Sequence, residues 1–177
     1  MILEIRRHAE RARKGDAHGG LTAGGAAMAR ALRRDAQPFA LVISSPRERA
    51  RDTAIAIAGR VDETAEGLAP SPDEALTQTQ YDAMTSQEEL VHLLGTNDPS
   101  RRFAQEQLAV WEGIARRLGE GDRALVVTHG GNIELPAALL ARRLDSVLGR
   151  LPLSYCEGVR VEHSNGDWRV ITRLGVA

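Results

Sequence analysis

Hydrophobic residues gather in three short runs that each end in polar or charged residues. These runs begin at Ile2 and cover 40–43 and 124–127 further along the chain. Short apolar runs bounded by polar residues are typical of buried strands. Near the C-terminus, apolar and charged residues alternate on both sides of Asn165-Gly166, a pair that favours a two-residue hairpin turn. The pattern therefore predicts three buried strands and a terminal hairpin.

Between the strands, apolar residues recur at intervals of three and four, which predicts amphipathic helices. In chain order, the predicted helices cover 22–35, 46–61, 86–94, 104–118 and 133–144. Ser45, Pro46 and Glu48 match a capping box, so we expect Ser45 to be the N-cap of the second helix. Thr22 has the same place before the first helix. Residues 62–80 follow no period and are predicted to form a crossover loop, with room for one short strand.

This order of elements predicts an α/β fold. Strands alternate with helices, which favours a three-layer α/β/α sandwich around a mostly parallel central sheet. A length of 177 residues is typical of one domain, so we expect a single domain over 1–177. In open sheets of this kind, ligands bind at the carboxyl ends of the strands.

Composition narrows the classes of function. The formal net charge of −1 and a pI near 6.5 give no overall basic field, so we expect no nucleic-acid partner. The longest apolar runs fall far short of the roughly 20 residues of a membrane span, and the start of the chain has no apolar leader. A single cysteine, Cys156, permits no internal disulfide. We therefore expect a cytoplasmic protein with no membrane contact and no cofactor.

The side chains that could bind or attack a substrate lie where the predicted strands end. Arg7 and His8 follow the first strand, Arg49 lies just beyond the second, and His129 follows the third. Arginine forks match phosphate oxygens with two hydrogen bonds each. The N–H groups of a helix start near Gly130 would favour an anion in the same place. The sequence therefore predicts a phosphate pocket.

Within this pocket, His8 is the candidate nucleophile. Neighbouring arginines favour the neutral imidazole by repelling a second positive charge, and a neutral ring can attack phosphorus. His129 is expected to donate a hydrogen bond to the transferring group. A zinc site is the competing interpretation, but two histidines lack a third ligand at a suitable spacing, and the arginines repel a dication. We therefore expect no bound metal.

Four motifs in this order resemble the histidine phosphatase superfamily, also called phosphoglycerate mutase-like. They are Arg7-His8-Ala9, Leu21-Thr22-x-x-Gly25, Ser45-Pro46-x-x-Arg49-Ala50-x-x-Thr53-Ala54 and Thr128-His129-Gly130-Gly131. The resemblance implies a phosphoglycerate mutase-like fold in which His8 is phosphorylated during turnover. It also implies Arg7 and Arg49 as phosphate ligands and His129 as the second pocket histidine.

One expected residue of that family is missing. Members often carry a glutamate that gives a proton to the leaving group, and the segment 73–78 resembles the region that holds it. Gln78 occupies the matching position and cannot act as a carboxylic acid. Either Glu74 or Asp73 serves instead, or the leaving group needs little protonation. Lys14 and Thr22 are candidates for contact with substrate.

The sequence thus predicts a metal-independent phosphatase. It would hydrolyse a phosphorylated small molecule or a phosphohistidine protein through a phosphohistidine intermediate on His8. Two alternatives stay open: a phosphoglycerate mutase-like phosphotransferase, and a non-catalytic family member that only binds phosphate groups. The physiological substrate and the oligomeric state are not determined by these residues.

Overall fold

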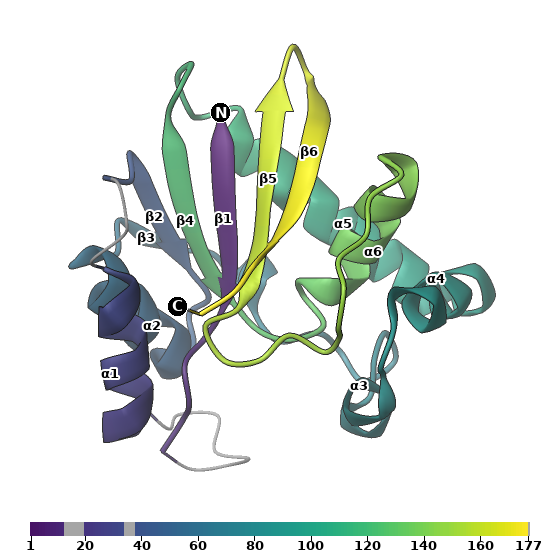
Figure 1. Cartoon of the computed structure of the whole chain (residues 1–177), viewed down its shortest axis with the longest axis horizontal. Helices are drawn as coiled ribbons and strands as arrows, with labels where there is room; N and C mark the ends of the chain where they lie inside the picture. The colour runs from purple at the N-terminus through teal and green to yellow at the C-terminus, as the bar shows by residue number, and fades with distance from the viewer. Residues whose placement is uncertain (13–19, 34–37, 177) are drawn as a thin grey trace.

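The chain folds around a six-stranded sheet, seen in a computed structural model that describes residues 1–12, 20–33 and 38–176 (Figure 1). The strand order is β3-β2-β4-β1-β5-β6. The strands are β1 (Ile2–Arg7), β2 (Leu41–Ser44), β3 (Glu63–Thr64), β4 (Arg123–Thr128), β5 (Gly158–Ser164) and β6 (Asp167–Leu174). The first four in sequence are mutually parallel, whereas β5 and β6 form an antiparallel hairpin on the side of β1. The predicted mostly parallel sheet is confirmed.

The helices differ from the prediction mainly at their ends. They are α1 (Ala23–Leu32), α2 (Glu48–Ala58), α3 (Gln78–Ala83), α4 (Gln87–Thr96), α5 (Asp98–Ala115) and α6 (Glu134–Arg143), with a 3-10 turn at Glu66–Leu68. Helix α3 was not predicted, although Thr77 and Gln80 form a capping box at its start. The long helix α5 begins earlier than expected because Asn97 caps it and Pro99 fits its first turn.

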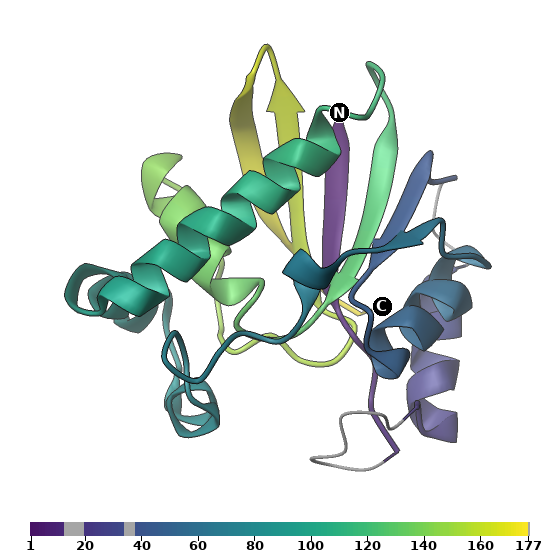
Figure 2. The ribbon, with the colours of Figure 1, turned by 180° about the vertical axis from the view of Figure 1, so that it is seen from behind.

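Two apolar cores lie on opposite faces of the sheet. On β4, Ala124 and Val126 join one core, while Leu125 and Val127 join the other. This alternation is the two-residue period of a strand that is buried on both faces. Helices α1 and α2 supply the second core, and α5 crosses the opposite face of the sheet (Figure 2). The three-layer α/β/α architecture is therefore confirmed.

Strand β1 is an inner strand between β4 and β5, which agrees with its prediction as a buried strand. Its carboxyl end lies level with those of its parallel neighbours, since Arg7 pairs with Thr128 and Ser44 pairs with Val127. Beyond the strand, the His8 amide donates to the Thr128 carbonyl at 2.9 Å. The sheet thus brings residues that follow three different strands to one edge.

The start of α2 corrects the predicted capping box. The helix begins at Glu48 with Arg47 as N-cap, and no side chain caps it. Ser45 lies two residues earlier, where its hydroxyl makes a 2.8 Å hydrogen bond with His129 Nε2. The same hydroxyl accepts the Arg47 amide at 3.3 Å, so Ser45 connects the segment before α2 to His129 instead of capping the helix.

The terminal hairpin agrees with the prediction. Asn165 and Gly166 have φ values of 52° and 77°, the left-handed pair that a tight turn between right-twisted strands requires.

Within the described residues, no helix is both long and apolar enough to span a bilayer.

Candidate active site

The structure brings His8, Arg49 and His129 together at the carboxyl edge of the sheet. Arg49 lies between the two imidazoles: its Nε donates to His8 Nε2 at 3.0 Å, and its Nη2 lies 3.1 Å from His129 Nδ1. The two imidazole rings are 5.2 Å apart, centroid to centroid. All three side chains are buried.

Helix α2 is anchored so that Arg49 reaches back to the strand ends. Thr53, one turn further along α2, donates its hydroxyl hydrogen to the Arg49 carbonyl at 2.7 Å. The same hydroxyl accepts the Ala9 amide at 2.9 Å, directly after His8. One buried threonine therefore fixes the first turn of α2 against the end of β1.

Hydrogen bonds determine which nitrogen of each imidazole carries the proton. His8 Nδ1 lies 2.7 Å from the Ala9 carbonyl, which can only accept, so the hydrogen is on Nδ1 and Nε2 keeps its lone pair. Arg49 can only donate, so His129 Nδ1 accepts and His129 Nε2 carries the hydrogen. That hydrogen is held by Ser45, although the sequence suggested that it would face the transferring group.

Both imidazoles are neutral at physiological pH. Burial lowers the pKa of His8 to about 3, and the like charges of Arg49, Arg7 and Arg11 act in the same direction. Burial, followed by Arg49, lowers the pKa of His129 to about 2. The predicted neutral ring of His8 is present, but burial contributes more to it than the repulsion by arginines.

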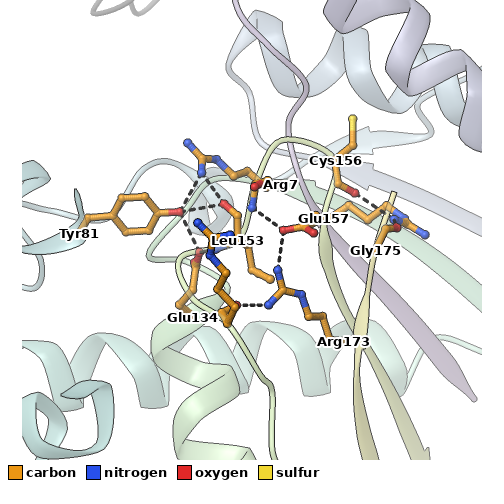
Figure 3. A network of polar contacts seen from close by, with 11 residues as sticks. Arg7, Tyr81, Glu134, Leu153, Cys156, Glu157, Arg173 and Gly175 are labelled. Carbon is orange, nitrogen blue, oxygen red and sulfur yellow. Dashed lines mark hydrogen bonds and ion pairs between the residues drawn. The ribbon is translucent and has the colours of Figure 1, made fainter. Parts of the chain in front are cut away.

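Arg7 is positioned by a second network (Figure 3). Its Nη1 donates to the Tyr81 hydroxyl at 3.0 Å and to the Leu153 carbonyl at 2.5 Å. Tyr81 donates in turn to the fully buried carboxylate of Glu134 at 2.8 Å, so a carboxylate is connected to Arg7 through one hydroxyl. The guanidinium also lies over the Tyr155 ring at 4.8 Å.

Gly130 makes room for this network. A Cβ atom at Gly130 would lie 2.3 Å from the Tyr81 hydroxyl, which no real side chain tolerates. Gly131 has a φ of 83°, a left-handed conformation that favours glycine. The expectation that Gly130 opens a helix is wrong, because α6 begins only at Glu134.

These residues enclose a cavity of about 340 Å³. Its cationic side consists of Arg7, Arg11 and Arg49 together with both histidines. The segment before α3 and α3 itself form another side, which is lined by Ser71, Asp73, Gln78, Tyr81 and Asp82. A phosphoryl group fits the cationic side, because guanidinium and imidazole donors surround it there.

Residues 4–174 match the family model of the histidine phosphatase superfamily (branch 1). The chain belongs to the histidine phosphatase superfamily. A comparison with curated proteins finds no match.

Solved structures show the same histidine phosphatase fold at low sequence identity. A phosphoserine phosphatase from Entamoeba histolytica has a TM-score of 0.69 and 16% identity, with 96% of this chain and 94% of that chain covered. A phosphoglycerate mutase from Bacillus anthracis has a TM-score of 0.66 and 20% identity, covering 96% and 91%. An α-ribazole phosphatase from Shigella flexneri has a TM-score of 0.60 and 18% identity, covering 96% and 94%.

In this member of the histidine phosphatase superfamily, the candidate proton donors differ in whether they line the cavity. Asp73 and Gln78 line the cavity, whereas Glu74, the other predicted donor, is exposed and is not part of the lining. Asp82, which the sequence analysis missed, also lines the cavity and accepts a 2.7 Å hydrogen bond from Gln78 Nε2. The spacing of four residues between Gln78 and Asp82 becomes informative only once α3 is known to be a helix.

The two predicted substrate contacts have different outcomes. Lys14 lies outside the described residues. Thr22 is not part of the cavity lining, because its hydroxyl caps α1 by accepting the Gly25 amide at 2.9 Å. It also donates to Glu10 at 2.6 Å. A Cβ atom at Gly25 would lie 2.3 Å from the Glu10 carbonyl oxygen, so the Thr22-x-x-Gly25 motif seats α1 against the chain after His8.

Proposed function

We propose that the protein is a metal-independent phosphatase that forms a phosphohistidine intermediate on His8. The observation that carries the proposal is the neutral His8 imidazole, whose Nε2 lone pair is held 3.0 Å from Arg49 Nε. The imidazole can attack phosphorus while the guanidinium beside it stabilises the negative charge of the phosphoryl oxygens. The phosphatase names of two structural neighbours support the same reaction class.

In the first step, His8 Nε2 forms a bond to phosphorus while the bond from phosphorus to the leaving oxygen or nitrogen breaks. The leaving atom takes a proton. In the second step, water attacks phosphorus and gives a proton to the carboxylate that protonated the leaving group, the bond from phosphorus to Nε2 breaks with its electron pair returning to Nε2, and inorganic phosphate leaves. Arg49 exchanges its hydrogen bond with Nε2 for one with a phosphoryl oxygen. Arg7 supplies further positive charge near the phosphoryl oxygens, where negative charge develops.

The proton for the leaving group would come from a carboxyl group that lines the cavity. We assign this role to Asp82 or Asp73, which both line the cavity, and Gln78 donates a 2.7 Å hydrogen bond to Asp82. A phosphohistidine substrate would need this proton less than an alkyl phosphate does, because imidazole is a good leaving group.

Rapid-quench labelling tests the proposal. Wild-type protein mixed with a 32P-labelled aryl phosphate or a phosphohistidine peptide should carry acid-labile phosphate at His8, and His8→Ala should neither form it nor turn over. His92→Ala is a matched control, since His92 is exposed and lies outside the cavity. Turnover of His8→Ala at the wild-type rate would exclude the mechanism.

Two other outcomes identify the alternatives. Isomerisation of a phosphorylated sugar acid faster than its hydrolysis would show a mutase, the activity named for the Bacillus anthracis neighbour. Tight binding of inorganic phosphate with no turnover of any phosphoester or phosphohistidine peptide would show a non-catalytic member. The amide of Gln78 at the cavity motivates this second alternative.

A further inference from the structure

One buried carboxylate connects three segments that surround the candidate catalytic cavity. Glu134, in the first turn of α6, is fully buried and does not line the cavity. Its Oε1 accepts the Tyr81 hydroxyl at 2.8 Å and the Leu153 amide at 3.0 Å, and its Oε2 accepts the Gly131 amide at 2.8 Å. Glu134 therefore holds together α3, the segment before β5 and the turn after His129.

The two oxygens of this carboxylate have different roles. The bond from Gly131 to Oε2 satisfies a backbone amide just before α6, which a neutral side chain could also do. Burial of a charge is unfavourable unless the charge is paired or well hydrogen-bonded. Among the described residues, Glu134 forms no direct ion pair, and its Oε1 is connected to the charge of Arg7 through one hydroxyl. Oε2 thus serves the helix, and Oε1 serves Arg7.

Both groups held by Oε1 are acceptors for Arg7 Nη1 (Figure 3). Nη1 donates to the Tyr81 hydroxyl at 3.0 Å and to the Leu153 carbonyl at 2.5 Å. Burial raises the pKa of Tyr81 well above its usual range, so the hydroxyl keeps its hydrogen. It donates this hydrogen to Glu134 and offers a lone pair to Arg7. One carboxylate oxygen therefore fixes both acceptors of a single guanidinium nitrogen.

This anchoring leaves one edge of the Arg7 guanidinium for a ligand. Two acceptors take the two hydrogens of Nη1, so the donors that remain are those on Nε and Nη2. Nε is buried and has no hydrogen-bond partner among the residues that the structure describes. Nε and Nη2 lie side by side in the guanidinium plane and can bind two oxygens of one phosphoryl group. The network therefore selects the edge of Arg7 that can bind phosphate.

The negative charge of Glu134 strengthens this arrangement. A hydroxyl that donates to a carboxylate becomes a better acceptor for the next donor in the chain. The hydrogen bonds from Arg7 to Tyr81 and from Tyr81 to Glu134 run in one direction, so each supports the other. A neutral side chain at position 134 would hold Arg7 with weaker bonds.

We propose that Glu134 is a positioning residue for the phosphoryl-transfer reaction. It fixes Arg7 through Tyr81 and Leu153, so that the Nε and Nη2 edge of the guanidinium faces the phosphoryl group at His8. This inference rests on the proposed phosphatase function, and it adds a residue that acts on the reaction without touching the substrate.

Glu134→Gln tests the proposal, with Tyr81→Phe as a milder second variant. The affinity for inorganic phosphate, measured by calorimetry at constant pH and ionic strength, should fall about tenfold in either variant, the size of one hydrogen bond to a charged group. Ser100→Ala is the matched control, because the buried Ser100 hydroxyl donates to the Ala75 carbonyl at 2.6 Å and Ser100 does not line the cavity. It should keep the wild-type affinity for phosphate.

A double-mutant cycle separates positioning from a general loss of structure. In an Arg7→Ala background, Glu134→Gln should change the phosphate affinity by about twofold or less, because the group that Glu134 positions is gone. In an Arg49→Lys background, Glu134→Gln should still lower the affinity about tenfold. Equal losses in the two backgrounds, or wild-type affinity in Glu134→Gln, would overturn the assignment.

Turnover is measured separately from binding. If the phosphate affinities follow the cycle but no phosphoester or phosphohistidine peptide is hydrolysed, the proposed function fails and the positioning of Arg7 by Glu134 stands. If the wild-type protein hydrolyses substrate, kcat/KM should fall about tenfold in Glu134→Gln and stay at the wild-type value in Ser100→Ala. An unchanged kcat/KM in Glu134→Gln would show that Glu134 serves only the fold.

Discussion

At the scale of single residues, the candidate site depends on two uncharged imidazoles on either side of one guanidinium. Arg49 can serve both rings because its Nε and Nη2 point to different acceptors. Burial lowers the pKa of Arg49 itself to about 10, so it stays protonated at neutral pH. The site keeps a nucleophilic lone pair beside a permanent positive charge only because both rings are buried.

These lowered pKa values predict a loss of stability in mild acid. In the unfolded chain each imidazole binds a proton near pH 6.5, whereas in the folded chain His8 and His129 do so only near pH 3 and pH 2. Between these pH values the unfolded state binds more protons, so the free energy of unfolding falls as the pH is lowered. Each imidazole should lower the free energy of unfolding by roughly 2 kcal/mol when the pH falls from 7 to 5.

Urea unfolding at both pH values measures this effect. His8→Asn should reduce the fall in unfolding free energy by roughly 2 kcal/mol, and the exposed His92→Asn should leave the fall as it is in wild type. Equal falls in His8→Asn and wild type would contradict a buried neutral His8.

At the scale of elements, helix ends determine which polar side chains are free to meet a substrate. The hydroxyl of Thr22 caps α1, whereas that of Ser45 accepts the Arg47 amide before α2 begins and also bonds to His129. In the sequence both residues look like N-caps, since each is a hydroxyl residue that precedes a helical pattern. The tertiary contact decides which hydroxyl becomes part of the site.

Thr22→Ala should therefore affect stability and not substrate affinity. Loss of the N-cap should lower the unfolding free energy by about 1 kcal/mol and leave KM within about twofold of wild type. Ser86→Ala is the matched control, since the Ser86 hydroxyl also accepts the amide three residues further along, at the start of α4, and Ser86 does not line the cavity. A severalfold rise in KM for Thr22→Ala alone would restore Thr22 as a substrate contact.

At the scale of the whole molecule, the anion pocket joins strands and helices from distant parts of the sequence, so a bound anion should stabilise the entire fold. Inorganic phosphate at 100 times its dissociation constant should raise the unfolding free energy by about 2.7 kcal/mol. Arg49→Ala should lose most of this gain, and the exposed Arg51→Ala on the same helix should keep it. Denaturant melts with and without phosphate at constant ionic strength give the measurement, and equal gains in both variants would place the anion elsewhere.

Patterns along the chain were enough to predict the longer strands, the layers and the motifs that carry His8, Arg49 and His129. These features depend on apolar periodicity and on short spacings, which are local properties of the chain. Their meeting at one sheet edge followed from the rule that parallel strands end together.

Only the tertiary structure decided which side chains share the cavity. Helix α3 is too short to leave a clear period, so the sequence offered Glu74 and Asp73 and missed Asp82, whereas Asp73 and Asp82 line the cavity and Glu74 does not. In the same way, Tyr81 is held at the cavity by a hydrogen bond to Glu134, 53 residues further along the chain. Hydrogen bonds and burial between distant segments set these positions, and such interactions leave no local pattern in the sequence.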